Sequence, residues 1–275
     1  MRGRRDVMAP KKTVFNLEGK VALVTGAGQG FGRAFALALA EAGAHVVCAE
    51  KIKATLDETA GLVRKLGRRV LPLLVDVASP DDVERMKNEI FSEFKRLDIA
   101  VNNAGIIHKP YRLHETPIEE WNRLISINLT GVFICMQQEI ELMLSQKSGV
   151  IINISSILGI VGLKPELMPR VSYIAAKHGM AGLTKQAAVE YATDGIRVNA
   201  IAPGYFEGTE IAKERLANQD AEVANERTKK IVERTPMKRR GKVQECIDLL
   251  LYLSSDGASY VTGQTIAVDG GWTAQ

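Results

Sequence analysis

The sequence predicts an α/β fold, a single doubly wound parallel sheet of about seven strands with helices on both faces. Short apolar runs alternate along the chain with longer segments whose apolar residues recur at helical spacing. The runs are continuously apolar, as expected for strands that are buried on both faces of a sheet. Regular alternation of such strands with helices is typical of parallel sheets with helical crossovers. No internal repeat or low-complexity linker divides the chain, so we expect one domain over residues 16–275.

The expected strands and helices follow one another without a break in this rhythm. Strands are expected over 21–24, 45–49, 70–75 (despite Pro72), 99–101, 150–154, 197–201 and 265–268. Helices are expected over 32–42, up to 66, from 80, and over 118–146, 171–192 and 243–253. The clearest helix start has Ser79 as N-cap, Pro80 at the first helical position, and Asp81 and Asp82 in the first turn.

Composition and charge limit the function classes. The 275 residues carry a formal net charge of +4, with the signs mixed along most of the chain. Residues 1–15 form a basic leader that we expect to be flexible and solvated, the alternative being a contact with nucleic acid or a membrane surface. The leader lacks the apolar core of a secretory signal, and no run of eighteen apolar residues occurs. We therefore expect neither a nucleic-acid partner nor a membrane partner.

The three cysteines favour a reducing compartment. Cys48, Cys135 and Cys246 lie far apart in apolar segments, without a CxxC pair or a paired histidine. Such residues are typical of buried free thiols. We expect a cytoplasmic protein without a metal site.

A glycine-rich turn follows the first expected strand. Thr25-Gly-Ala-Gly-Gln-Gly-Phe-Gly32 joins this strand to a helix in the pattern TGxxxGxG. Glycines permit a tight turn and allow a pyrophosphate to approach backbone N–H groups at the helix N-terminus. The same pattern also occurs as a plain strand–helix connection, so by itself it is weak evidence for a cofactor.

Polar residues follow the next three strands, at the sheet edge where ligands bind in such folds. Glu50 ends the second strand and can accept hydrogen bonds from adenosine ribose hydroxyls, which favours NAD over NADP. The adjacent Lys51 can instead attract a 2′-phosphate, so NADP is not excluded. Asp76 ends the third strand and Asn102-Asn-Ala-Gly105 the fourth, and either can be a simple turn or a cofactor contact.

A tyrosine–lysine pair is the candidate group for proton transfer. Tyr173 and Lys177 lie four residues apart on an expected helix and therefore share a face. A nearby ammonium stabilises a phenolate, which lowers the pKa of the tyrosine toward values useful for proton transfer. Ser155 and Ser156 follow the strand at 150–154, at the same sheet end as the glycine turn. Asn128 lies in an apolar helical setting, either bonded to backbone or functional.

These motifs together resemble the classical short-chain dehydrogenases/reductases over about residues 17–272. The matching segments are TGAGQGFG (25–32), DV (76–77), NNAG (102–105), Asn128, NISS (153–156), YIAAK (173–177), NAIAPG (199–204) and VDGGW (268–272). NNAGII and AVDGGW also look like the gluconate- and deoxygluconate-type dehydrogenases of this family. The resemblance implies a Rossmann-type sheet, an NAD(P)-dependent oxidoreductase acting on a secondary alcohol or ketone, and a homotetramer.

The resemblance also implies the role of each site residue. The catalytic tetrad is Asn128, Ser156, Tyr173 and Lys177. Tyr173 exchanges the proton with the substrate oxygen, Ser156 binds that oxygen, and Lys177 binds the nicotinamide ribose and lowers the tyrosine pKa. Asn128 positions a water that links Lys177 to solvent. The implied cofactor contacts are Gly26, Gln29, Gly30, Phe31, Gly32, Glu50, Asp76, Val77, Asn103, Ala104, Gly105, Tyr173, Lys177, Pro203 and Gly204.

The segment between Ser156 and Tyr173 is longer than the family pattern. It carries residues 163–170, which we expect to form an extra loop near the substrate mouth. The longer spacing leaves Ser155 as an alternative to Ser156, although the GIVG that follows favours Ser156.

Basic residues in the expected pocket loops predict an anionic or polyhydroxylated substrate, such as a sugar acid. The candidates are His108, Lys109, Arg112 and Arg170, and arginine presents a two-pronged donor to a carboxylate. Their alternative is solvated loop charge. The charged stretch 210–234 is expected to be a solvated lid helix. Two other functions stay open, an NADP(H)-dependent 3-oxoacyl-type reductase and a catalytically silent cofactor-binding scaffold or sensor of the same fold.

Overall fold

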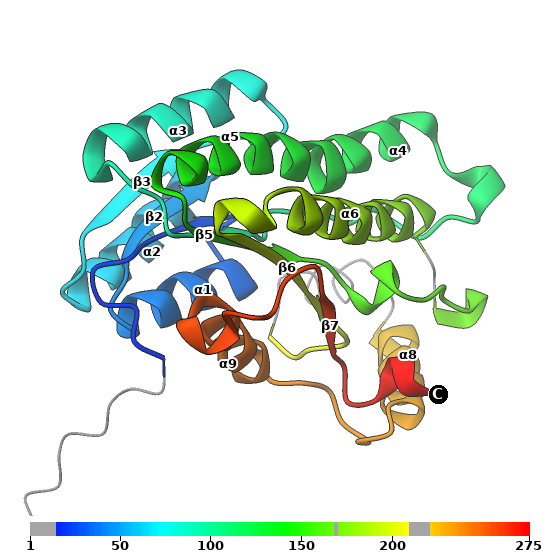
Figure 1. Cartoon of the computed structure of the whole chain (residues 1–275). Helices are drawn as coiled ribbons and strands as arrows, with labels where there is room; N and C mark the ends of the chain where they lie inside the picture. Colours follow the sequence, from blue (N-terminus) through cyan, green and yellow to red (C-terminus); the bar gives the residue numbers. More distant parts are fainter. Residues whose placement is uncertain (1–14, 168–169, 209–220) are drawn as a thin grey trace, which may run out of the picture.

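Seven parallel strands form the central sheet of the computed structural model, which describes residues 15–167, 170–208 and 221–275 (Figure 1). The strands are β1 (Val21–Thr25), β2 (His45–Glu50), β3 (Val70–Leu74), β4 (Ile99–Asn102), β5 (Gly149–Ile154), β6 (Ile196–Pro203) and β7 (Thr265–Val268). Their order is β3-β2-β1-β4-β5-β6-β7. The predicted doubly wound parallel sheet is confirmed.

Helices cover both faces of the sheet (Figure 1). On one face lie α3 (Pro80–Phe94), α4 (Ile118–Ile125), α5 (Gly131–Gln146) and α6 (Val171–Glu190). On the other lie α1 (Gly30–Glu41), α2 (Lys53–Lys65) and α9 (Val243–Ser254). A further helix, α8 (Ala221–Arg234), lies near the C-terminal residues at one side of the molecule.

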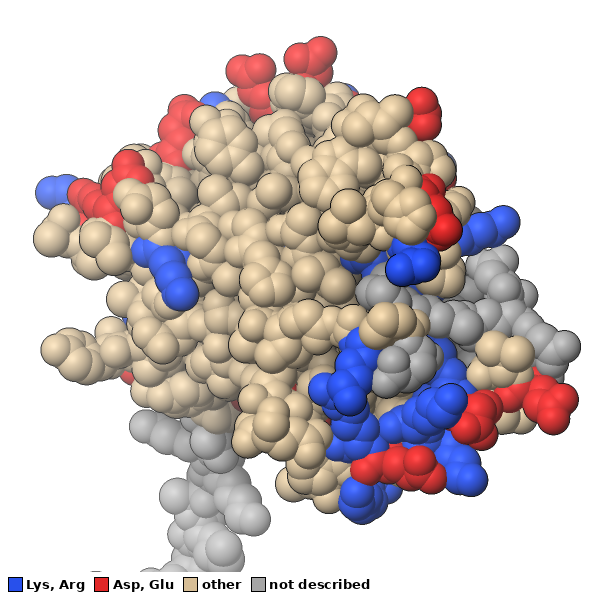
Figure 2. Space-filling view, turned by 90° about the vertical axis from the view of Figure 1, so that its right-hand side faces the viewer, with Lys and Arg blue, Asp and Glu red and all other residues tan. Residues whose placement is uncertain are grey.

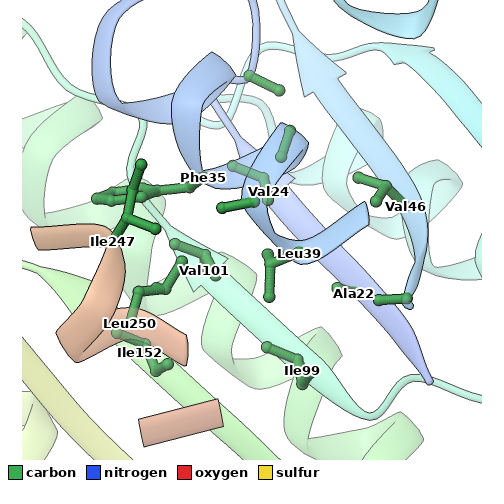
Figure 3. Close-up of a cluster of buried hydrophobic side chains, with 14 of the residues drawn as sticks. Ala22, Val24, Phe35, Leu39, Val46, Ile99, Val101, Ile152, Ile247 and Leu250 are labelled. Atoms are coloured by element: carbon green, nitrogen blue, oxygen red, sulfur yellow. The ribbon is translucent and has the colours of Figure 1, made fainter. Parts of the chain in front are cut away.

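The two faces of the sheet carry separate apolar cores because successive strand residues point to opposite faces. Val24 and Val46 pack with Phe35 and Leu39 of α1 and with residues of α9 (Figure 3). The intervening Leu23 packs on the opposite face with residues of α3, α5 and α6. Complete burial of one such large side chain contributes about 1.5–3 kcal/mol. Both faces of the sheet therefore need a covering layer of helices, which the helices between successive strands supply.

Two local details follow from sequence chemistry. Pro72 is tolerated because β3 is an edge strand, where one side of the backbone needs no partner. The expected cap of α3 is confirmed, since the Ser79 hydroxyl accepts a hydrogen bond from the Asp82 amide at 3.3 Å.

The predicted helix over 118–146 differs in one respect. It contains a π-helical turn, Ser126–Thr130, between α4 and α5. Such a turn adds a residue without breaking the helix and is frequent at functional sites. A 3.6-residue pattern does not reveal it, because the apolar residues continue on both sides.

The basic leader and the possibility of a membrane span were the other structural points of the sequence. The leader lies outside the described residues except for its last residue, Phe15. No helix in the described ranges combines the length and apolar character that crossing a bilayer requires.

Candidate active site

A cleft of about 400 Å³ opens where β1 lies between β2 and β4, the point at which the strand order reverses. Loops from the carboxyl ends of several strands surround it, as expected for an open parallel sheet. The predicted cofactor residues all line this cleft, from the glycine turn (Gly26, Gln29, Gly30, Phe31, Gly32), the ends of β2 and β3 (Glu50, Asp76, Val77), the NNAG segment (Asn103, Ala104, Gly105), α6 (Tyr173, Lys177) and the end of β6 (Pro203, Gly204).

The glycine turn is built for close backbone approach. Gly26 and Gly30 have φ angles of +63° and +54°, which L side chains rarely adopt. A Cβ atom on Gly32 would lie 2.0 Å from the Gly26 carbonyl oxygen. Helix α1 begins at Gly30, so its first amides lie at the cleft, where they suit a pyrophosphate.

Thr25 and Asn103 tie this turn to the NNAG segment. The Thr25 hydroxyl accepts hydrogen bonds from the backbone amides of Asn103 and Ala104, at 3.0 and 3.1 Å. The Asn103 side chain donates to the carbonyl oxygens of Thr25 and Gly26, at 3.0 and 3.2 Å. The two loops therefore form one rigid wall of the cleft.

Glu50 is held by backbone amides. Its carboxylate accepts hydrogen bonds from the amides of Gly28 (3.0 Å), Lys51 (2.8 Å) and Ile52 (3.1 Å). The neighbouring Lys51 ammonium pairs with Asp76, and this hydrogen bond holds the pKa of Asp76 below its usual value. The part of the cleft at the ends of β2 and β3 thus carries a carboxylate held by three amides and a lysine that is paired with a second carboxylate.

Tyr173 and Lys177 lie on the inner face of α6, and both side chains are buried. The Lys177 ammonium lies 5.7 Å from the centre of the Tyr173 ring and donates to the Ile154 carbonyl oxygen at 2.6 Å. Burial lowers the pKa of Lys177 to about 7. Lys177 therefore changes between its charged and neutral forms near pH 7, beside the Tyr173 phenol.

The two serines after β5 have different partners, although both line the cleft. The Ser155 hydroxyl donates to the Lys177 carbonyl oxygen at 3.3 Å, so it joins β5 to α6. The Ser156 hydroxyl accepts from the Leu158 amide at 3.1 Å, which leaves its proton available for an acceptor in the cleft. The geometry favours Ser156 as the residue that binds the substrate oxygen.

Asn128 lies in the π-helical turn, is completely buried and does not line the cleft. Its side-chain oxygen accepts from the Ile106 amide and its nitrogen donates to the Ile106 carbonyl oxygen, both at 2.9 Å. The side chain thus holds the segment that follows Gly105, which corresponds to the backbone-bonded alternative. The water-positioning role stays a prediction.

None of the four predicted substrate residues lines the cleft. His108 and Arg170 are buried, and the Arg170 guanidinium donates to the His108 carbonyl oxygen. The His108 ring contacts the Lys109 carbonyl oxygen and the Ser172 hydroxyl. Lys109 and Arg112 are exposed. The residues predicted to bind substrate therefore hold the neighbouring loop together or face solvent.

Other cleft residues were not predicted from the sequence. Tyr205 and Phe206 follow Gly204, Arg227 and Thr228 come from α8, and Arg240 precedes α9. The Arg240 guanidinium donates to the Phe206 carbonyl oxygen. The one signal in the sequence is the position of Tyr205 and Phe206 directly after Pro203-Gly204.

Comparison with known proteins supports the assignment of this cleft. A family model described as Enoyl-(Acyl carrier protein) reductase matches residues 26–273. The cis-4-hydroxycyclohexanecarboxylate dehydrogenase of Sinomonas cyclohexanicum is 42% identical over 93% of this chain and 97% of its own. The 2-dehydro-3-deoxy-D-gluconate 5-dehydrogenase of Bacillus subtilis is 40% identical, with coverages of 95% and 97%. The 3-oxoacyl-[acyl-carrier-protein] reductase FabG of Thermotoga maritima is 38% identical, with coverages of 93% and 98%.

Solved structures agree with the fold. A short-chain type dehydrogenase/reductase from Mycobacterium marinum superposes with a TM-score of 0.87 at 38% identity, covering 95% of this chain and 98% of its own. A structure from Agrobacterium tumefaciens that contains bound NADP has a TM-score of 0.83 at 40% identity, with coverages of 96% and 100%. From the family model and from these relatives and structures, the chain belongs to the short-chain dehydrogenase/reductase family of oxidoreductases.

Proposed function

We propose that this protein transfers a hydride between NAD(H) and a secondary alcohol or its ketone, with Tyr173 as the acid–base group. The observation that carries the proposal is the shared cleft, in which Tyr173, Lys177 and Ser156 lie at one end of a surface lined by the glycine turn and Glu50. A proton-transfer group and a dinucleotide cradle are the two parts that this chemistry needs.

The nicotinamide supplies or takes the hydride when the cofactor is bound. Tyr173 takes the hydroxyl proton of the alcohol in oxidation and returns a proton to the oxygen in reduction. Ser156 donates a hydrogen bond to the same oxygen and orients it. Lys177, held by Ile154, favours the phenolate form of Tyr173 through its charge. Asn128 keeps the Ile106 backbone in place beside these groups.

NAD is the proposed cofactor because Glu50 lines the cleft at the end of β2, and a carboxylate beside the adenosine ribose would repel a 2′-phosphate. Three backbone amides fix this carboxylate, and Lys51 is engaged by Asp76. NADP is the alternative, which the NADP-containing structure from Agrobacterium tumefaciens supports. Arg240, which lines the cleft beside Phe206, suits the pyrophosphate of either dinucleotide.

The proposed substrate is a polar anion such as a sugar acid. Two relatives act, by their names, on carboxylates, 2-dehydro-3-deoxy-D-gluconate and cis-4-hydroxycyclohexanecarboxylate. The assignment of its binding to His108, Lys109, Arg112 and Arg170 stays a prediction, and it requires movement of these residues toward the cleft. A 3-oxoacyl-type reductase is the alternative, favoured by the FabG relative.

A catalytically silent scaffold of the same fold is the main competing function. The tetrad residue types are all present and three of them line the cleft, which favours an active enzyme. We further propose a homotetramer and a cytoplasmic location. The three cysteines are free and buried in separate parts of the chain, consistent with a reducing compartment.

Binding and turnover measurements test the proposal. Titration with NADH and NADPH gives the cofactor preference, and a screen of alcohols and ketones by nicotinamide absorbance gives the activity. Tyr173→Phe should lower kcat by about 10²–10⁴-fold while the Kd for NADH changes less than threefold. Turnover in that variant equal to wild type would disprove the role of Tyr173, and cofactor binding without any turnover in wild type would favour the silent scaffold.

A further inference from the structure

The inner face of α8 carries an arginine between apolar neighbours. Ala224, Arg227 and Ile231 are spaced by three and four residues and are 5%, 6% and 7% exposed. The opposite face is solvated, and its Glu226 and Lys230 form an exposed ion pair at 3.6 Å. A guanidinium on the buried stripe of a helix costs free energy unless it serves acceptors there. Arg227 has an acceptor in the Leu167 carbonyl oxygen, and its side chain also lines the cleft.

Arg227 lines the same cleft as Tyr173 and Ser156. Tyr205 and Thr228 are among the other residues of its lining. One turn further along α8, Ile231 belongs to the same buried cluster as Tyr173 and Leu158. The Arg227 guanidinium donates to the Leu167 carbonyl oxygen at 3.0 Å, so it also contacts the segment between Ser156 and Tyr173. Arg227 and Tyr173 therefore line one cleft, and the helix that carries the arginine packs against the cluster that contains the tyrosine.

The charge of the surrounding surface suits an anion. On the face that looks out past α4 and α8, Lys and Arg side chains gather in the lower part, with a few acidic side chains among them (Figure 2). Positive potential around a cleft raises the local concentration of anionic ligands and their association rate. The basic side chains on this face and the buried guanidinium of Arg227 carry charge of the same sign.

We propose that Arg227 binds the carboxylate of a hydroxy- or oxo-acid substrate whose reacting carbon lies at Tyr173 and Ser156. The assignment rests on the proposed function, because it takes the tyrosine end of the cleft as the site of chemistry. A guanidinium offers five N–H donors in a plane and binds carboxylates through paired hydrogen bonds. Arg227 thereby decides between anionic and neutral substrates of the same shape, a task that the sequence had suggested for His108, Lys109, Arg112 and Arg170.

Calorimetric titration of two small probes tests the proposal without requiring turnover. Cyclohexanecarboxylate and cyclohexanecarboxamide have the same shape and differ in charge. Each is titrated at pH 7 into the full-length protein saturated with NADH, or with NADPH if that cofactor binds more tightly. The wild type should bind the carboxylate about 10- to 100-fold more tightly than the amide.

Arg227→Met should remove this preference, since methionine fills the stripe between Ala224 and Ile231 without charge. Arg227→Gln is a second neutral variant that keeps a donor for Leu167, and Arg227→Lys should retain part of the preference. Lys230→Met removes one charge from the solvated face of the same helix and should leave the preference unchanged.

Three results would overturn the proposal: no carboxylate binding by the wild type, equal affinity of the wild type for both probes, or a preference that survives in both neutral variants. Failure of the proposed function is a separate result, namely the lack of hydride transfer by the wild type with every alcohol and ketone in the absorbance screen.

Discussion

The Lys177 ammonium donates to the Ile154 carbonyl oxygen at 2.6 Å, so the last residue of β5 fixes the cation 5.7 Å from the centre of the Tyr173 ring. The same burial that positions the ammonium lowers its pKa from 10.5 to about 7. The unfolded chain therefore holds this proton between about pH 7 and 10.5, whereas the folded chain does not. The free energy of unfolding should rise with pH through this window, and the cost of burying Lys177 is fully present below pH 7.

Lys177→Met should accordingly stabilise the cofactor-free protein at pH 6, by up to about 4 kcal/mol, and less at pH 10. Urea denaturation of wild type and variant at the two pH values measures the difference. Turnover should fall at least 100-fold in the variant because the phenolate of Tyr173 loses its cation. A stability difference that is the same at both pH values would contradict the account.

Burial of Glu139 should make the free energy of unfolding depend on pH in the opposite direction. It is buried in α5, accepts a hydrogen bond from the Asn102 side chain at 3.0 Å, and has one oxygen without a partner among the described residues. Burial raises its pKa from 4.5 to about 8. The folded chain holds this proton between about pH 4.5 and 8 and the unfolded chain does not, so stability should fall as pH rises through that range.

Glu139→Gln, which resembles the protonated side chain, should be more stable than wild type at pH 8.5, by up to about 4 kcal/mol, and nearly equal to it at pH 5. Urea denaturation at the two pH values measures this. Glu141→Gln, an exposed position on the same helix, should show no such divergence.

Substitution of Ser155 and of Ser156 should lower kcat by different amounts. Ser156→Ala should lower kcat by about 10²-fold or more, because the substrate oxygen loses a hydrogen-bond donor. Ser155→Ala should lower kcat less than tenfold, since its hydroxyl serves the Lys177 carbonyl oxygen. Steady-state assays with one alcohol substrate distinguish them, and a larger loss in Ser155→Ala would reverse the assignment.

Glu50 should set the cofactor preference. Glu50→Ala removes the carboxylate that we propose repels a 2′-phosphate, and the ratio of kcat/KM for NAD to that for NADP should fall at least tenfold. Glu41→Gln, an exposed carboxylate at the far end of α1, is the control and should leave the ratio unchanged. A wild-type preference for NADP would refute the role of Glu50 before any variant is made.

Asn128→Ala should destabilise the protein by about 2–3 kcal/mol, because the amide and carbonyl of Ile106 both lose their side-chain partner. Asn122→Ala makes the same chemical change at an exposed position of α4 and should cost less than about 0.5 kcal/mol. Thermal and urea unfolding of both variants provide the comparison.

Local pattern was sufficient for the sheet, the helices and the cleft residues that directly follow strands. Gly26, Glu50, Asp76 and Asn103 each end or follow a strand, and a parallel sheet brings these ends together whatever the helices do. The pairing of Tyr173 with Lys177 could be predicted because the two residues are separated by about one helical turn.

The inward-facing position of Arg227 could not be predicted from the sequence, for a physical reason. The charges of α8 alternate in sign, which indicates a solvated helix, and only tertiary packing shows that one of its arginines faces inward. The surroundings of His108 and Arg170 could not be predicted either, and their role toward substrate stays a prediction. Loop residues have no periodicity, so nothing in the sequence shows that these two side chains are buried and contact each other's loop segment.

The π-helical turn at Ser126–Thr130 affects which side chains of α5 face the core. A residue added within a continuous helix rotates everything after it by roughly 100° relative to an uninterrupted α-helix. The angular phase of α5 therefore differs from that of α4, and a helical wheel drawn through 118–146 with one phase assigns the wrong side chains to the interior. Removing a single residue from this turn would turn the whole of α5 about its axis, carrying buried Met143 and Glu139 out of the core together. The number of residues in this turn therefore decides which face of α5 is buried.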